Sequence, residues 1–310
     1  GWTRGLLRPS YRRFAPRVAM AWSLGEDRRT VLDAGFGVFL NQWAYSVQQA
    51  LAQTLPFFFA KTVSAAADAV QPIHRTSTVL QAPSTGTVGG NTMLWDFRTE
   101  FARNYSVSLQ RQVGEHTTFG LTLLRSAIVG ADSSTVLNVP TPGPGAIGPR
   151  RPVPELANVT AIRWDGYSLF NSATVRAQRR LSGGLALSGA YTLSKAVDDA
   201  SDPGPTSSET NLPQDVRNMA AERADASFDH RHRFVGSLTY APPAVPGEGW
   251  MPALTRDWHV GMVALLESGA PFTVNISTDR ANVGPGPAQR PNQVCDPNVG
   301  GARTRDQWFN

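Results

Sequence analysis

Apolar and polar residues alternate along much of the chain. Within residues 104–113, Tyr105, Val107 and Leu109 occupy one set of alternate positions and polar residues fill the other. After a short turn, residues 118–123 repeat the pattern. A period of two is typical of β-strands, because successive side chains of a strand point to opposite faces of a sheet. The pattern therefore predicts a hairpin with one apolar and one polar face.

The same alternation recurs before and after this hairpin. It predicts eight strands, at residues 18–24, 32–38, 104–113, 118–123, 172–180, 185–193, 234–240 and 258–266. We expect strands of about nine to fourteen residues, which suits a tilted transmembrane strand better than the short strands of most soluble sheets. The predicted fold class is all-β, as an antiparallel transmembrane β-barrel.

The connections between these strands alternate in length. Short ones at 25–29, 114–115 and 182–184, with a longer one at 242–256, alternate with long ones at 41–100, 130–165 and 198–229. Bacterial outer-membrane barrels have short periplasmic turns and long extracellular loops, so the alternation indicates which end of the sheet faces outward. The positions of Trp22, Tyr240 and Trp258 beside the short connections match a periplasmic aromatic girdle.

Composition excludes several classes of protein. Charged residues make up 17% of the 310-residue chain, which also holds 28 Gly and 23 Pro, and no apolar run is long enough for a transmembrane helix. The net charge of +5 comes from scattered Arg residues without a nucleic-acid-binding motif, so we expect no nucleic-acid partner. The single cysteine, Cys295, excludes an intramolecular disulfide and any multi-cysteine metal site.

A soluble β-sandwich that binds carbohydrate would show the same alternation. In a sandwich the apolar residues are buried against a second sheet, whereas in a barrel they face lipid. The residues that distinguish the two are Tyr105, Val107, Leu109, Phe119, Leu121 and Leu123.

Several strings, in one order, resemble the barrel of TonB-dependent receptors of the Oar-like kind, which carry a carboxypeptidase-regulatory-like domain. The most particular are Gln214–Arg223 and Phe228–Phe234. The others are Phe14–Trp22, Val31–Phe39, Tyr105–Arg111, Gly189–Asp199, Ser268–Thr273, Arg290–Asn292 and Trp308–Asn310.

The resemblance implies a 22-stranded barrel with a plug, energised through an N-terminal TonB box. On this basis we expect residues 1–310 to be a partial barrel domain, a fragment without plug, TonB box or last strands. About eight strands of the wall would then form an open, curved sheet with unpaired edges.

The resemblance further implies a cell outer membrane protein of a Gram-negative bacterium that binds and imports a nutrient and is not an enzyme. Its expected partners are outer-membrane lipid, an unknown extracellular ligand and, through the missing N-terminal part, the TonB-ExbB-ExbD system. The alternative is a surface binding or adhesion protein that keeps the barrel and transports nothing.

Candidate site residues lie in the predicted outer loops. Trp43, Tyr45, Trp95 and Phe97 could stack on a substrate such as a sugar, siderophore or peptide, or pack the loop on itself. No catalytic set or cofactor motif is present, so neither is expected.

Two clusters invite a metal interpretation. His230 and His232 are two residues apart, but an Arg-His cluster at a barrel rim is better explained as hydrogen bonding between strands and loops. Asp198, Asp199 and Asp202 lack the spacing of an EF-hand, so solvated loop charge is favoured over Ca²⁺. No metal site is therefore expected.

Overall fold

The computed structural model describes residues 13–41, 88–93, 99–201, 212–243, 246–247, 249–251, 258–284, 289–297 and 304. In these residues the predicted all-β class is confirmed, with mostly antiparallel strands and almost no helix. The elements are β1 (Arg17–Leu24), β2 (Thr30–Leu40), β3 (Val88–Met93), β4 (Phe101–Val113), β5 (Thr117–Leu137), α3 (Ile147–Arg150), β6 (Leu156–Ser182), β7 (Leu185–Asp198), the 3-10 turn η1 (Met219–Glu222), β8 (Ala224–Asp225), β9 (His232–Tyr240) and β10 (Val260–Glu267).

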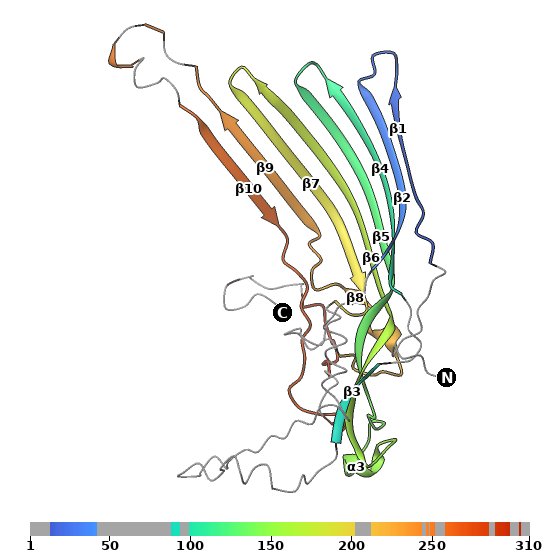
Figure 1. The fold of residues 1–310 in the computed structure, drawn as a ribbon. Coiled ribbons are helices and arrows are strands. Elements are labelled where there is room, and N and C mark those ends of the chain that lie inside the picture. The colour runs from blue at the N-terminus through green and yellow to red at the C-terminus, as the bar shows by residue number, and fades with distance from the viewer. Residues whose placement is uncertain are drawn as a thin grey trace, which may run out of the picture.

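The eight predicted strands pair in chain order. The sheet runs β1-β2-β4-β5-β6-β7-β9-β10, and each neighbour along this path is antiparallel (Figure 1). Short hairpin turns lie at one end of the tall, curved sheet and the long connections at the other. Within the described residues β1 and β10 each have a neighbour on one side, so the sheet is open, as expected for part of a barrel wall.

Glycine allows the tightest of these turns. Ser182 pairs with Leu185, leaving Gly183 and Gly184 as the two-residue loop between β6 and β7. Their φ angles of +59° and +78° lie in the left-handed region, which a type I′ hairpin turn requires at both central positions.

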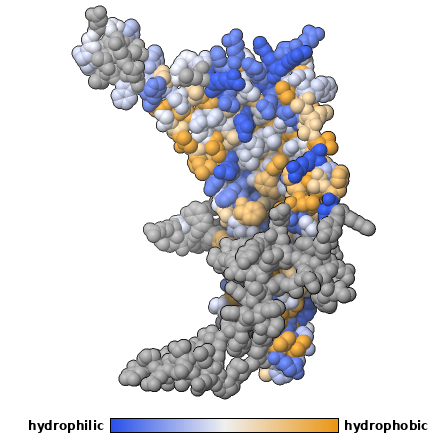
Figure 2. Space-filling view, in the orientation of Figure 1, coloured by the Kyte–Doolittle hydropathy of each residue, from blue (hydrophilic) through white to orange (hydrophobic). Residues whose placement is uncertain are grey.

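The apolar face of the sheet is exposed. The six residues that distinguish a barrel from a sandwich are all exposed, with exposed fractions from 42% for Leu121 to 50% for Leu123. The other four are Tyr105, Val107, Leu109 and Phe119. No second sheet covers them within the described chain, so the sandwich alternative is wrong, and the apolar face is the one a barrel turns toward lipid. Figure 2 shows apolar side chains across the sheet below a hydrophilic end at the hairpin turns.

The opposite face is polar and internally hydrogen bonded. Across neighbouring strands, Thr174 and Thr192 share a hydroxyl hydrogen bond of 2.9 Å, and the Ser126 hydroxyl donates to Asn104 at 2.7 Å. The same face continues to Asp198, because residues 188, 190, 192, 194, 196 and 198 alternate with the outward-facing residues of β7. This is the lumen face of the sheet.

Two strands are much longer than predicted. β5 has 21 residues and β6 has 27, so the expected long loop at 130–165 is wrong: its two ends are strand, and the connection is residues 138–155. The extension is offset from the rest of the sheet by register shifts between Val129 and Ser133. Beyond them, β3 adds to β6 as a parallel strand.

The buried apolar residues of the described chain gather at this outer end. Ile162 and Trp164 form one cluster with Met93, and Val136, Val139 and Val283 form another. The outer connections are therefore packed around small cores of their own. In the described part of the chain, no helix has the length and hydrophobicity needed to cross a membrane.

Candidate ligand-binding pocket at the outer end of the sheet

The connections after β5, β7 and β10 hold one another in place. The Arg290 guanidinium makes two hydrogen bonds to the Glu222 carboxylate, of 2.5 and 2.9 Å. Arg217 donates to the Val139 carbonyl at 2.9 Å, and Asn282 donates to the Gly143 carbonyl at 2.8 Å. Residues more than sixty positions apart thus form one outer structure.

Asp279 shapes the connection after β10. Its carboxylate accepts hydrogen bonds from the backbone N–H groups of Val283 and Gly284 and from the Gln289 side chain. Desolvation opposes the charged form, but these hydrogen bonds outweigh it, so the pKa of Asp279 is lowered from its usual value. The carboxylate therefore works as a fixed anion that orders the loop.

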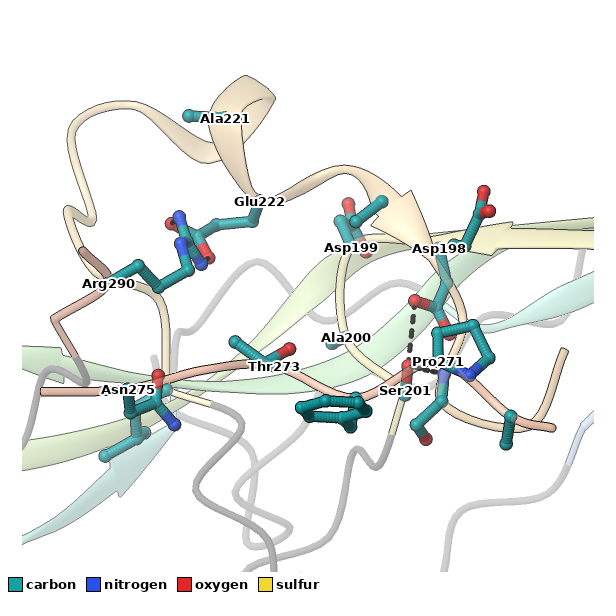
Figure 3. A pocket seen from close by; sticks show the side chains of 16 residues that line it. Asp198, Asp199, Ala200, Ser201, Ala221, Glu222, Pro271, Thr273, Asn275 and Arg290 are labelled. Carbon is teal, nitrogen blue, oxygen red and sulfur yellow. Dashed lines mark hydrogen bonds and ion pairs between the residues drawn. The ribbon is translucent and has the colours of Figure 1, made fainter. Parts of the chain in front are cut away.

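Between these connections lies a pocket of about 810 Å³, within the usual size range of small-ligand sites. Its walls come from the end of β7 (198–201), the region of η1 and β8 (212–227), and the chain after β10 (270–275 and Arg290), as Figure 3 shows. Asp198 lies on the lumen face at the outer end of β7, so the pocket reaches this face at the outer end of the sheet.

Two neighbouring carboxylates lie in the floor of this pocket. Asp198 is 5% exposed, and one of its oxygens accepts a hydrogen bond from the Ser201 hydroxyl at 3.0 Å (Figure 3). Half-buried Asp199 accepts from the Tyr167 backbone N–H at 2.8 Å. Desolvation raises the pKa of both groups, with a smaller contribution from a neighbouring aspartate in each case. The expectation of solvated loop charge is therefore wrong for Asp198, because its side chain is buried at the end of β7.

The other charged residues of the wall are paired. Besides the pair of Arg290 and Glu222, Asp225 lies 2.9 Å from the Lys195 ammonium group. These ion pairs engage two of the four described carboxylates that line the pocket, Glu222 and Asp225.

The Arg-His cluster makes hydrogen bonds to neighbouring strands and loops, as predicted. The His230 ring is hydrogen bonded to the Ser268 carbonyl at 2.8 Å, and the His232 ring to the Tyr191 hydroxyl at 2.7 Å. Buried Asp229 accepts from the Ala196 backbone N–H. In the residues that the structure describes, no group of three or more His, Cys, Asp or Glu side chains could hold a metal ion.

The aromatic residues predicted to bind substrate are not placed. Trp43, Tyr45, Trp95 and Phe97 lie outside the described residues, as does Asp202. Phe272, which is 65% exposed and lines the pocket, was missed by the sequence reasoning. The sequence feature that could have pointed to Phe272 is its position in Ser268–Thr273, one of the strings that carry the family resemblance.

These features define the class: an outer-membrane β-barrel wall with lipid on one face and a polar lumen on the other. Comparison of sequences agrees, since the family model of the outer membrane beta barrel domain matches residues 1–310. The chain belongs to this family and is a protein of the Gram-negative outer membrane. No curated protein matches it.

Solved structures similar to the chain include two outer-membrane transporters. The FrpB iron transporter from Neisseria meningitidis (F3-3 variant) is 14% identical, with a TM-score of 0.39 over 73% of this chain and 24% of that one. The outer membrane transporter YddB from Escherichia coli is 9% identical, with a TM-score of 0.46 over 73% of this chain and 26% of that one. The chain thus spans about a quarter of the length of these transporters.

Proposed function

We propose that this chain is part of the barrel wall of a TonB-dependent receptor of the Oar-like kind, which imports a nutrient and performs no enzymatic step. The observation that carries the proposal is the position of the pocket. It lies between the outer connections and reaches the lumen face at Asp198, on a sheet whose other face is an exposed apolar band. A solute caught there is already on the path through the barrel.

Two further observations support the receptor assignment. Ala221 and Glu222 of the string Gln214–Arg223 line the pocket, and the string Phe228–Phe234 leads from the pocket wall into β9. Polar lumen-facing residues such as Thr174, Thr192, Ser188 and Ser237 suit a wide or plug-filled lumen, because such side chains are costly to bury in a dry interior. In this proposal the TonB-ExbB-ExbD system supplies the energy for import, through a part of the protein outside this chain.

The test compares solute depletion from the medium by three strains: the parent bacterium, one lacking this gene, and one lacking TonB. We expect both deletions to abolish uptake of the same solute. If deletion of this gene impairs surface attachment or solute binding while loss of TonB changes nothing, the protein is instead the non-transporting surface binding protein.

A pair of variants then tests the pocket. Ala270→Trp places an indole inside the pocket and should lower uptake severalfold. Val294→Trp, at a position 93% exposed and away from the pocket, is the matched control and should leave uptake unchanged. Equal uptake by the two variants would contradict the role of the pocket.

A further inference from the structure

Two arginines interrupt the apolar face of the sheet near its outer end. Arg125 of β5 pairs directly with Tyr105 of β4, which is 44% exposed on this face. Arg103 is two positions from Tyr105 on β4, so its side chain points to the same face, and both arginines are exposed. The two residues are diagonal neighbours across the β4–β5 pair, which places their Cα atoms about 7–8 Å apart. Two guanidinium groups are therefore close together on the lipid side of the sheet.

A third arginine reaches the same face from the connection after β7. The guanidinium carbon of exposed Arg223 lies 4.8 Å from the centre of the Tyr167 ring. Tyr167 of β6 pairs with Val129 of β5, which is four positions beyond Arg125 and points to the same face. We call Arg103, Arg125 and Arg223 the rim arginines.

The rim arginines have no carboxylate partner. In the described part of the chain, none of the three forms an ion pair. Lys195, on the same face, differs from them because it is paired with Asp225 at 2.9 Å. The guanidinium carbon of Arg103 lies 5.0 Å from the centre of the Phe101 ring, as that of Arg223 does near Tyr167. Contact with a ring face holds a guanidinium group and leaves its N–H edge available to an anion.

The height of the rim arginines on the sheet matches a boundary of the membrane. Arg125 is eight positions after Thr117, the first residue of β5, and Val129 is twelve positions after it. At a rise of about 3.3 Å per residue and a tilt of about 45°, these positions are about 19 and 28 Å from Thr117 along the membrane normal. The apolar band of an outer-membrane barrel is about 25 Å tall. The rim arginines therefore lie at its outer edge, at the level of lipid headgroups.

We propose that the rim arginines bind a phosphorylated glycolipid of the outer leaflet, with two phosphate groups on a sugar headgroup. One phosphate accepts hydrogen bonds from Arg103 and Arg125 and the other from Arg223, since guanidinium groups match phosphate oxygens as bidentate donors. The Cα atoms of Arg125 and Tyr167 are about 14 Å apart, which suits two separated phosphates better than one phosphodiester. The acyl chains lie along the apolar face below. This binding needs neither TonB nor import and goes beyond the proposed function.

The test uses the natural protein purified from outer membranes and exchanged into a nonionic detergent. Native mass spectrometry measures its affinity for diphosphoryl lipid A, for monophosphoryl lipid A, which lacks one phosphate, and for phosphatidylglycerol. We expect diphosphoryl lipid A to bind about tenfold more tightly than the monophosphoryl form, because one set of charge-assisted hydrogen bonds is lost. Equal affinities for the two forms, or phosphatidylglycerol binding as tightly as diphosphoryl lipid A, would overturn the proposal.

Variants locate the site on the sheet. Arg125→Gln and Arg103→Gln should each weaken binding of diphosphoryl lipid A by about tenfold. Arg179→Gln is the matched control, because Arg179 is exposed on the same face at the hairpin-turn end, where it pairs with Thr117, and its loss should leave the affinity unchanged. Arg223→Gln lies outside the strands of the main path and gives the same test if a strand variant does not assemble. Equal losses of affinity in Arg125→Gln and Arg179→Gln would show attraction to the whole basic surface and contradict the assignment.

The outcomes also separate this proposal from the transport proposal. Uptake that depends on TonB, in a protein that does not distinguish the two forms of lipid A, would reject the glycolipid site and leave the receptor function standing. Selective binding of diphosphoryl lipid A through the rim arginines, in a protein that imports nothing, would support the site and reject transport.

Discussion

Leu121 gives the most direct test of the lipid-facing surface. It lies on β5 between Leu109 of β4 and Val175 of β6, and all three are exposed on the apolar face. It lies four positions after Thr117, the first residue of β5, and four positions before Arg125, which is exposed on the same face. With a rise of about 3.3 Å per residue, Leu121 is about 13 Å along the strand from either position.

Because transmembrane strands tilt by about 45°, this distance corresponds to about 9 Å along the membrane normal. Leu121 is therefore near the middle of the apolar band, where an arginine facing lipid costs about 2–4 kcal/mol. At about 1.4 kcal/mol for each factor of ten, Leu121→Arg should shift the folding equilibrium by roughly 30- to 700-fold.

The matched control is the next residue of the same strand. Thr122 pairs with Ser108 and Thr174 on the lumen face, so Thr122→Arg introduces the same charge into a polar surface. Urea unfolding of the protein in lipid vesicles, with folding followed by heat-dependent gel mobility, compares the two variants. We expect Thr122→Arg to cost less than about 1 kcal/mol. Equal costs, or a larger cost for Thr122→Arg, would refute the assignment of lipid and lumen faces.

Two other predictions concern a turn and a loop. At Gly184 the φ is +78° and an added Cβ would clash with the Ala241 carbonyl oxygen, whereas at Gly114 the φ is +64° and nothing lies within 4 Å of an added Cβ. Gly184→Ala should therefore destabilise the protein more than Gly114→Ala. Equal free energies of unfolding in urea for the two variants would contradict this. The lowered pKa of Asp279 means that this carboxylate stabilises the folded loop fully above the ordinary aspartate pKa of 3.8, and that the stabilisation is lost as the pH falls through the lower folded pKa. Proteolysis of the loop at residues 278–284 should therefore accelerate below about pH 4. Asp279→Asn should make that loop equally sensitive at all pH values, and a loop whose cleavage does not change with pH in the unmutated protein would be evidence against the anchoring role.

The eight strands of the main path and their order could be predicted from the sequence, whereas β3 and β8, inside the expected long connections 41–100 and 198–229, were not predicted. Alternation places residues such as Leu109 and Leu121 on one face, and this local property needs no knowledge of distant residues, because each strand has a period of two in any sheet. The short turns join consecutive strands as antiparallel hairpins, so the order of the sheet was also predictable. The bounds were less certain, since the outer part of β5 around Ser133, Ser134 and Thr135 does not alternate between polar and apolar residues.

The outer end depends on contacts between distant segments, which the sequence does not reveal. Val136 is buried because Val283, far along the chain, packs against it, and nothing within either segment predicts that contact. In the same way Asp198 resembles an ordinary loop carboxylate in the sequence, yet it is buried, and the chain after β10 lines the same pocket. Periodicity records which way a side chain points relative to its own strand, whereas burial depends on which distant segment covers it.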